Sequence, residues 1–249
     1  MRSRIARVAR SVGLASLLVV SSALTAGATP GPTTPQRATA DITENDVTAS
    51  NKKVGEAYGA LVAMWSADFK QLGQRFLPPS IVRYRGNVRS QCGILQANNA
   101  QYCAALNTIF FDEVFLARQA KAAANELGTD GDMAAVGIIA HEMGHAVAAQ
   151  LGQMSPIPYE NEATADCLAG AFTEQSARDG SLEKGDIEEA FFGLAAAGDP
   201  TPEFTGIRQV DNRIARRAAV MGHGTRAQRQ ANFSAGYDGG ARACLAVFR

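Results

Sequence analysis

Two histidines and a glutamate form the segment of this chain that is best suited to chemistry. His141 and His145 are four residues apart, and Glu142 directly follows the first of them, in the pattern H-E-x-x-H. On a helix, residues four apart lie on one face, so both imidazoles can reach the same metal ion. The carboxylate beside them can face a water bound to that ion. The pattern therefore predicts a zinc site that activates water.

The segment that carries these residues is expected to be a buried helix over 133–151. It is apolar or small on nearly every side, and Gly152 marks its end. Either Asp130 or Asp132 is expected to cap its start. Imidazoles and a carboxylate are costly to bury unless something pairs with them, and a cation is the simplest partner. Gly144 either admits the backbone of a neighbouring helix or reflects ordinary tight packing.

Two acidic residues further along the chain can complete such a site. A catalytic zinc usually has three protein ligands and one open position. Glu162 and Asp166 are also four residues apart, within a helix expected over 159–177. If the two helices pack together, Glu162 becomes the third ligand, and Asp166 accepts a hydrogen bond from a ligand imidazole. A solvated acidic face is the alternative, which the small and apolar neighbours disfavour.

The remaining histidine, His223, stands between two glycines, which predicts an exposed loop. Hydrolysis of an amide develops negative charge on the attacked oxygen, and a donor besides the metal ion would stabilise that charge. His223 is a candidate for this catalytic role, and an ordinary surface position is the alternative. Tyr102, Tyr159 and Tyr237 are weaker candidates because no spacing argument supports them.

The elements around the site predict an α+β fold, mostly helical with a small N-terminal β-sheet. Apolar residues recur at helical spacing over 47–77, before two prolines. Short strands are expected at 81–85 and 107–112. The second strand either aligns an extended peptide along its edge or is simply a core strand. Further helices are expected over 113–127, 181–197 with Ser181 as its N-cap, 211–221 and 227–234.

Composition and the N-terminus limit the class of protein. The chain has 249 residues, is 46% hydrophobic and carries no formal net charge, so we expect one ordinary domain and no nucleic-acid partner. Basic residues, a short apolar run and Ala26-Gly27-Ala28 predict a cleaved signal peptide over 1–28. An uncleaved signal anchor is the alternative. A Pro- and Thr-rich linker over 29–44 and a folded domain over 45–249 follow, in a protein that is secreted or held in the cell envelope without a stable membrane span.

Four cysteines follow the predicted signal peptide. An even number in an exported chain indicates two disulfides, for which three pairings are possible. Cys92–Cys103 closes a short loop and is the first expectation. Cys167–Cys244 would then tie the C-terminus to the helix that carries Cys167. A cysteine-rich metal site is the rival interpretation, and the lack of a C-x-x-C pair disfavours it.

Several short segments, taken in order, also match a known family. They are Pro78 to Val82, Cys92-Gly93 with Tyr102-Cys103, Phe111-Asp112, His141 to His145, Glu162 to Gly170, Gly193 to Asp199, Gly222 to Thr225 with Gln228-Arg229, and Gly236-Tyr237 with Cys244. Through them the chain resembles, over roughly residues 50–249, the bacterial family named "putative neutral zinc metallopeptidase", a branch of the gluzincins. The pattern departs from the family after Cys103, where a proline is missing, and at Pro200, where aspartate is common. Both departures concern loops.

The resemblance implies a zincin-like fold with an HExxH active-site helix, one Zn²⁺ per chain and protein or peptide substrates. It maps His141, His145 and Glu162 to the metal ligands, Glu142 to the general base and Asp166 to the aspartate that supports a ligand. We therefore expect a secreted zinc metallopeptidase, a hydrolase in which Glu142 takes a proton from the zinc-activated water.

Two other functions fit the same residues. An exported binding or structural protein would keep zinc in a closed site with four protein ligands, the fourth being His223, Asp166 or a cysteine. A zinc amidase that acts on cell-wall links would share the metal site and differ in its substrate. The number of protein ligands separates the first alternative from a peptidase, and a substrate screen separates the second.

Overall fold

The computed structural model describes residues 41–199 and 202–248, without the side chains of 219–221. The predicted signal peptide at 1–28 and most of the predicted linker at 29–44 lie outside the described residues. Residues from Asp41 onward form one compact unit. Among the described residues, none of the helices is both long and apolar enough to cross a bilayer.

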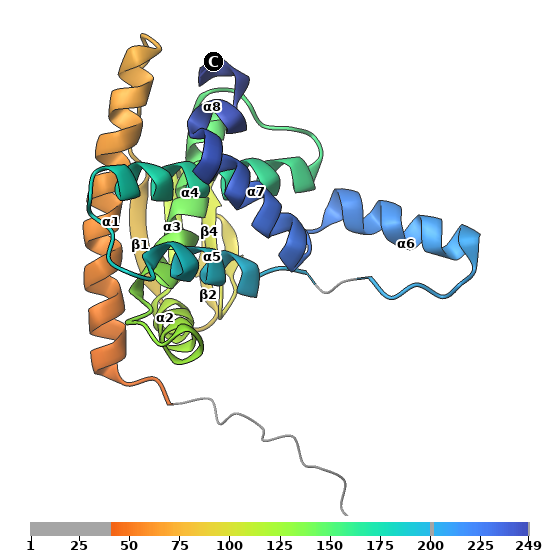
Figure 1. Ribbon diagram of the computed structural model, residues 1–249, viewed down its shortest axis with the longest axis horizontal. Coiled ribbons are helices and arrows are strands. Elements are labelled where there is room, and N and C mark those ends of the chain that lie inside the picture. Colours follow the sequence, from red (N-terminus) through yellow and green to blue (C-terminus); the bar gives the residue numbers. More distant parts are fainter. Residues whose placement is uncertain (1–40, 200–201, 249) are drawn as a thin grey trace, which may run out of the picture. The chain divides into compact units, whose positions relative to one another are not determined.

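The described elements place most of this unit in helices (Figure 1). In chain order they are α1 (Glu44–Gln71), β1 (Ser80–Tyr84), β2 (Val88–Ser90), β3 (Gly93–Leu95), β4 (Ala100–Cys103), the 3-10 turn η1 (Ala104–Leu106), β5 (Thr108–Asp112), α2 (Glu113–Leu127), α3 (Asp132–Gln150), α4 (Pro158–Arg178), α5 (Asp186–Ala196), α6 (Arg208–Met221), α7 (Arg226–Gly239), α8 (Ala241–Cys244) and η2 (Ala246–Phe248). The predicted fold class, mostly helical α+β with a small N-terminal sheet, is confirmed.

The main sheet is mixed and has three strands in the order β1-β5-β4. Strand β5 runs parallel to β1 and antiparallel to β4, and β2 pairs with β3 in a separate hairpin. Every residue of β5 is buried. The expectation that the strand at 107–112 offers its edge to a peptide is wrong, because neighbours pair with both of its edges. Strands β1 and β4 are instead the two edges of this sheet, and β4 was not among the strands predicted from the sequence.

Helix α3 lies at the centre of the unit. Of its 19 residues, 15 are buried, in agreement with the predicted all-round burial. Helices α1, α2, α4 and α5 and strand β4 pack against it, and Figure 1 shows α3 between α1 and the α4–α7 side of the molecule. Helix α2 coincides with its predicted span, and α3 and α4 differ from theirs by one residue at each end.

Glycines allow α3 to approach two neighbouring helices closely. A Cβ atom at Gly144 would lie 2.9 Å from the Cα of Ala165 in α4 and 3.0 Å from its carbonyl oxygen. One at Gly137 would lie 2.6 Å from the carbonyl oxygen of Ala190 in α5. Of the two interpretations of Gly144, the close approach of a neighbouring backbone is therefore the correct one. It brings the first turns of α4 against the middle of α3.

Helix α1 starts and ends earlier than its apolar pattern predicts. Thr43 and Asp46 form a capping box, in which each side chain accepts a hydrogen bond from the backbone of the other residue, so the helix begins at Glu44. The last residue of the predicted linker is therefore helical. The helix ends at Gln71, because Gly73 adopts a φ of 69°, and it does not continue to residue 77.

Two predicted helix caps are wrong. Helix α5 begins at Asp186, not near residue 181, so Ser181 does not cap it. The N-cap position of α3 is held by Gly131, with a φ of 80° that favours glycine, so neither Asp130 nor Asp132 caps that helix. Helices α6 and α7 occupy their predicted positions but are longer than predicted, by three residues at the start of α6 and by five at the end of α7.

Two disulfides join the four cysteines as Cys92–Cys103 and Cys167–Cys244. This is the pairing that was the first expectation among the three possible ones. The first bond links the β2–β3 hairpin region to the end of β4, and the second links α8 to α4. Paired cysteines are typical of proteins outside the reducing cytosol, which agrees with an extracytoplasmic chain.

The close contact at Gly144 predicts opposite results for two glycine-to-alanine substitutions. Gly144→Ala gains helix propensity, but its methyl group meets the Ala165 backbone, so we expect a loss of about 1–3 kcal/mol of unfolding free energy. Gly59→Ala on α1 meets no atom within 4 Å and should gain about 0.4–1 kcal/mol. Urea unfolding of both variants measures the difference. Equal effects at the two positions would contradict the close approach.

Candidate metal centre

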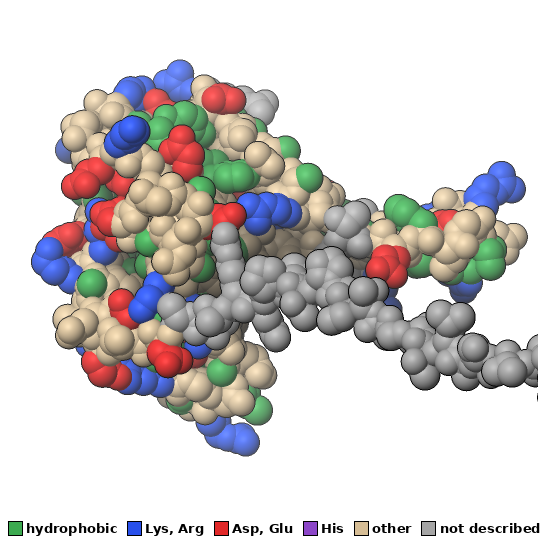
Figure 2. Space-filling model, turned by 60° about the horizontal axis from the view of Figure 1, so that its bottom comes forward, with side chains coloured by type: hydrophobic (Ala, Val, Ile, Leu, Met, Phe, Trp, Pro, Cys, Tyr) green, Lys and Arg blue, Asp and Glu red, His purple; other side chains and the backbone are tan. Residues whose placement is uncertain are grey.

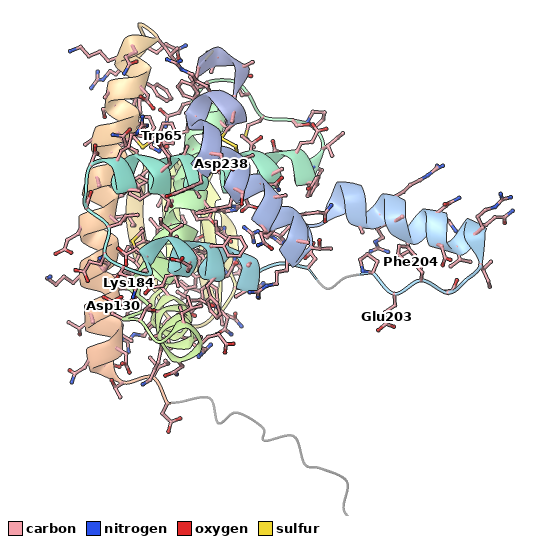
Figure 3. All side chains as sticks on the ribbon, viewed as in Figure 1. Trp65, Asp130, Lys184, Glu203, Phe204 and Asp238 are labelled. Carbon is pink, nitrogen blue, oxygen red and sulfur yellow. A yellow bond between two sulfur atoms is a disulfide. The ribbon has the colours of Figure 1, made fainter. Side chains whose placement is uncertain are left out.

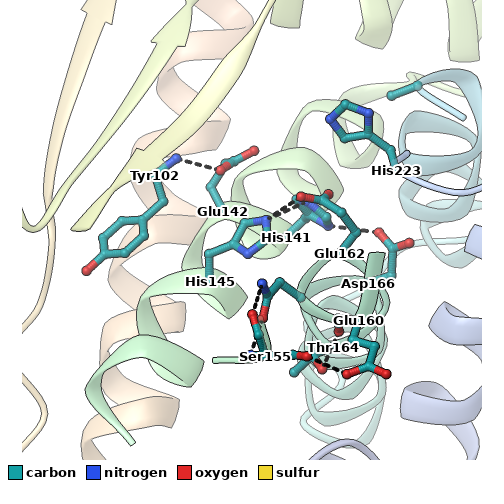
Figure 4. A network of polar contacts seen from close by, with 12 residues as sticks. Tyr102, His141, Glu142, His145, Ser155, Glu160, Glu162, Thr164, Asp166 and His223 are labelled. Carbon is teal, nitrogen blue, oxygen red and sulfur yellow. Dashed lines mark hydrogen bonds and ion pairs between the residues drawn. The ribbon is translucent and has the colours of Figure 1, made fainter. Parts of the chain in front are cut away.

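The side chains of His141, His145 and Glu162 converge on one point between α3 and α4 (Figure 4). The Nε2 atoms of the two histidines lie 3.2 Å apart. Glu162 Oε2 is 3.2 Å from His141 Nε2, and Glu162 Oε1 is 3.5 Å from His145 Nε2. One ligand atom from each of the three residues therefore lies within 4.8 Å of the others, as metal ligands must. The two helices do pack as the sequence analysis required.

The chemistry of this cluster fits a cation. Glu162 Oε2 is buried and makes no well-aligned hydrogen bond, although it is close to His141 Nε2. A buried carboxylate oxygen without such a bond is unfavourable unless another group compensates its charge. Two imidazole nitrogens and a carboxylate are a donor set that zinc accepts. The residues therefore fit the metal that the H-E-x-x-H pattern predicted.

Asp166 fixes the orientation of the first imidazole. His141 Nδ1 lies 2.8 Å from Asp166 Oδ1, and Asp166 is fully buried in α4. The carboxylate can only accept, so Nδ1 carries a proton and Nε2 is the nitrogen that faces the cluster. This is the supporting contact that the four-residue spacing of Glu162 and Asp166 predicted.

Arg229 from α7 neutralises the charge of Asp166. This role was not predicted from the sequence, where Arg229 stood only within one of the segments that match the family. Its Nη2 lies 2.6 Å from Asp166 Oδ1 and its Nε 3.1 Å from Oδ2, in a bidentate pair that is almost fully buried. Nη1 donates to the carbonyl of Ala197 at 3.4 Å. Nη2 is also 3.2 Å from His141 Nδ1, but both atoms are donors, so we assign its hydrogen bond to Asp166. No local spacing signals this contact, because 63 residues separate the partners.

The same contacts shift the pKa values of two residues in the cluster. Burial acts to lower the pKa of His141, but the hydrogen bond to Asp166 and the nearby Glu162 carboxylate outweigh it and raise the pKa to about 9. Burial acts to raise the pKa of Glu162, and the nearby imidazoles of His141 and His145 hold it far below its usual range. The two shifts describe a cluster in which His141 is protonated and Glu162 ionised, so a metal ion would take the place of the proton on His141 Nε2.

Glu142 points to the side of the cluster that faces the sheet. Its Oε2 accepts a hydrogen bond of 2.7 Å from the backbone N–H of Tyr102 in β4. The Tyr102 hydroxyl donates to Asn107 Oδ1 at 3.0 Å and points away from the histidines (Figure 4). Its backbone therefore contributes to the site, whereas its phenol is not placed for the oxyanion role considered above.

A cleft of about 840 Å³ opens beside the cluster. Its walls come from β4, α3, the start of α4 and the segment that precedes α7. His223 lies in that wall, and its side chain is 62% exposed. Its Nδ1 atom is 3.6 Å from Asp199 Oδ1. Tyr159 and Tyr237 are not among the residues that line the cleft. Its volume is typical of ligand-binding pockets.

The described residues offer the cluster three ligands and no evident fourth. All four cysteines are in disulfides. Asp166 uses its oxygens for His141 and Arg229, and His223 is not within the ligand group. A three-ligand site with a cleft beside it has the arrangement of catalytic zinc sites, which keep one position open.

Comparisons with known proteins agree with this geometry. A family model described as "Putative neutral zinc metallopeptidase" matches residues 4–248. The chain is 31% identical to "Uncharacterized protein YpfJ" of Escherichia coli strain K12 over an alignment of 250 residues. This alignment covers 92% of this chain and 83% of the relative. The protein of the same name from Escherichia coli O6:H1 has the same identity and coverage. No solved structure matches the chain.

The buried Arg229–Asp166 pair predicts a large effect of one arginine substitution. Arg229→Ala leaves a buried carboxylate unpaired, so we expect a loss of about 3–5 kcal/mol of unfolding free energy. Because Asp166 orients His141, zinc affinity should also fall by roughly 10–100-fold. Urea unfolding and competition with a zinc chelator measure the two effects.

The matched control is Arg178→Ala. Arg178 forms an exposed pair with Glu174 on the same helix, and such a pair contributes about 0.5 kcal/mol or less. Equal losses in the two variants would show that burial of the Arg229 pair has no special role.

Proposed function

Because the chain belongs to the family of putative neutral zinc metallopeptidases, we propose that it is a zinc-dependent peptidase. The observation that carries the proposal is the convergence of His141, His145 and Glu162 beside an open cleft, with Glu142 next to them. In this proposal the three residues bind one Zn²⁺ per chain. A bound zinc ion lowers the pKa of water toward about 7 and polarises a carbonyl group.

Glu142 acts as the general base in the proposed reaction. The Tyr102 N–H binds its Oε2 at 2.7 Å, which fixes the carboxylate and leaves Oε1 to accept a proton. Glu142 then carries that proton to the nitrogen of the leaving amine. Its burial, at 6% exposure, limits exchange of the proton with bulk water. His223 is our candidate for the donor that binds the developing oxyanion, supported by its position in the cleft wall.

Strand β4 is suited to align an extended peptide in the cleft. The Tyr102 N–H points away from β5, because it binds Glu142, and strand residues two apart share that direction. The backbone groups of Ala100 therefore also face away from β5. Ala100 and Tyr102 both line the cleft. Because Glu142 occupies the Tyr102 N–H, a peptide strand along this edge would pair with the Ala100 backbone and the Tyr102 carbonyl. It would pass directly beside Glu142, in the way that sheet edges bind extended ligands.

Export is part of the same proposal. We propose that residues 1–28 are a signal peptide, that 29–44 link it to the domain, and that 45–249 act outside the cytoplasm, in the envelope or the medium. The two disulfides support an oxidising compartment. A closed structural zinc site is disfavoured, because the described residues supply the cluster with three ligands.

Substitution of Glu142 tests the proposed reaction. In Glu142→Gln the amide cannot take up the proton, so peptide hydrolysis should fall by roughly 10²–10⁴-fold while zinc content stays at one per chain. Hydrolysis of a broad peptide library and elemental analysis measure the two quantities. Glu188→Gln, an exposed position on α5, is the matched control and should retain full activity. Wild-type rates in Glu142→Gln would refute the proposed role.

Substitution of His223 separates a catalytic role from a ligand role. We expect His223→Ala to lower kcat about 10²-fold, by removal of an oxyanion donor, with zinc content unchanged. Tyr159→Phe, a neighbouring change outside the cleft lining, should leave kcat unaltered. Loss of zinc from His223→Ala would instead support the closed structural site. An unchanged kcat would show that His223 is an ordinary surface residue without a catalytic role.

A further inference from the structure

A second group of acidic side chains lies where α3 and α5 begin. Asp130, Asp132, Asp186 and Glu189 each offer one carboxylate oxygen, and these oxygens all lie within 4.8 Å of one another. Asp130 lies beside the start of α5 in Figure 3. None of the four belongs to the candidate zinc centre or lines its cleft. We refer to them as the acidic cluster.

Part of this cluster has an ordinary structural role. Glu189 Oε2 accepts a hydrogen bond of 3.0 Å from the Met133 N–H, which caps α3 in place of an N-cap side chain. Asp186 Oδ2 accepts from the Glu183 N–H at 2.8 Å. These contacts use one oxygen of each carboxylate. They explain why acidic residues stand at helix N-termini, but they do not account for the remaining oxygens.

Two of the remaining carboxylate oxygens are buried without a well-aligned hydrogen bond. Asp132 Oδ1, Glu189 Oε1 and Thr129 Oγ1 make no well-aligned hydrogen bond, and they are three of eight such buried side-chain atoms among the described residues. The Thr129 hydroxyl is near Glu189 and acts to lower the pKa of that carboxyl, against the larger effect of burial. Glu189 is fully buried. An unpartnered buried carboxylate oxygen is costly, and an unseen ion or water is the usual explanation. Glu162 Oε2, in the candidate zinc centre, is another of the eight.

The charges around the cluster leave it strongly negative. Lys53 pairs with Asp132 Oδ2 at 2.9 Å, and it is the one cation for which the described residues show an ion pair to the four carboxylates. Burial, and then the charge of neighbouring carboxylates, raises the pKa of Asp132, Asp186 and Glu189. A bound cation would remove both the repulsion and the unpartnered oxygens.

We propose that the acidic cluster binds one calcium ion, which ties the start of α3 to the start of α5. The donors are oxygens only, without histidine or cysteine, and therefore suit a hard cation rather than zinc. They come from three segments: the loop before α3, the first residue of α3 and the first turn of α5. Such a dispersed set matches the flexible coordination of Ca²⁺ better than the near-ideal octahedron that Mg²⁺ requires.

The site would stabilise the helix that carries His141 and His145, and it does not depend on the proposed peptidase activity. The fixed position of α3 along its axis depends on its packing against α4 and α5, as the close contacts at Gly144 and Gly137 show. An ion at the N-terminus of α3 would hold its first turn against α5. Loss of this ion should lower the thermal stability of the domain, and it should leave all three zinc ligands in place.

The test is thermal unfolding of the zinc-loaded full chain with CaCl₂ or MgCl₂ added to about 10 mM, above the roughly 10⁻⁴–10⁻³ M affinity of extracellular calcium modules. Calcium at one hundred times its Kd should raise Tm by about 5–10 °C. Calorimetric titration with CaCl₂ should give one site per chain. Zinc content, measured before and after, should not change.

Two variants place the ion. Asp130→Asn changes an exposed ligand, and Glu189→Gln keeps an oxygen that can accept from the Met133 N–H while it removes the charge. Both should fold and lose most of the calcium-dependent rise in Tm. Asp238→Asn, an exposed position on α7, is the control and should respond as the wild type does.

Three outcomes would overturn the proposal. A calcium response of equal size in Asp130→Asn and Glu189→Gln would place the ion elsewhere. A rise in wild-type Tm with MgCl₂ but not with CaCl₂ would identify the wrong cation. No change in Tm with either salt would show that the acidic cluster only caps the two helices.

Discussion

The close contact between α3 and α4 is the constraint on which the rest of the structure depends. The absence of a side chain at Gly144 lets the Ala165 backbone approach α3, and this contact fixes how the faces of the two helices meet. His141 and His145 point from one helix and Glu162 and Asp166 from the other, in an interior where unpaired polar groups are costly. The small residue at the contact is therefore part of one arrangement with the polar residues around it, which Figure 4 shows.

The carboxylate of Asp166 extends this arrangement to the C-terminal part of the chain. It accepts hydrogen bonds from His141 on α3 and Arg229 on α7, so three helices meet at one buried charge. Helix α7 also lies against α4 so closely that a Cβ atom at Gly170 or Gly236 would overlap the opposite backbone. The disulfide Cys167–Cys244 joins α4 to α8, the short helix that follows α7. The C-terminal helices thus support the orientation of a metal ligand.

One face of the compact unit carries charged side chains of both signs. Figure 2 shows acidic and basic side chains interspersed over the face it presents, with no single-sign patch. This agrees with the formal net charge of zero of the full sequence. The cleft is the place where the β4 backbone, Glu142 and the metal cluster lie side by side.

Helical spacing in the sequence predicted which side chains share a helix face. Contacts between residues far apart in the sequence were not predicted. Spacing of four residues placed His141 with His145, and Glu162 with Asp166, on common faces. The Arg229 contact spans 63 residues and has no local pattern. Strand β4 is only four residues long and half-buried, without clear alternation, so only the strand at 107–112 was considered as a peptide edge, and the alternative that it is a core strand is the correct one.

X-ray absorption at the zinc edge of the purified protein tests the central claim most directly, because it reports the atoms bound to the metal. The account predicts two imidazole nitrogens, from His141 and His145, a carboxylate oxygen from Glu162 and one further light atom from solvent, at about 2.0–2.2 Å. In Glu162→Gln the two-imidazole signal should remain while zinc affinity falls. A sulfur neighbour at about 2.3 Å, a third imidazole, or an unchanged zinc affinity in Glu162→Gln would contradict a His-His-Glu centre.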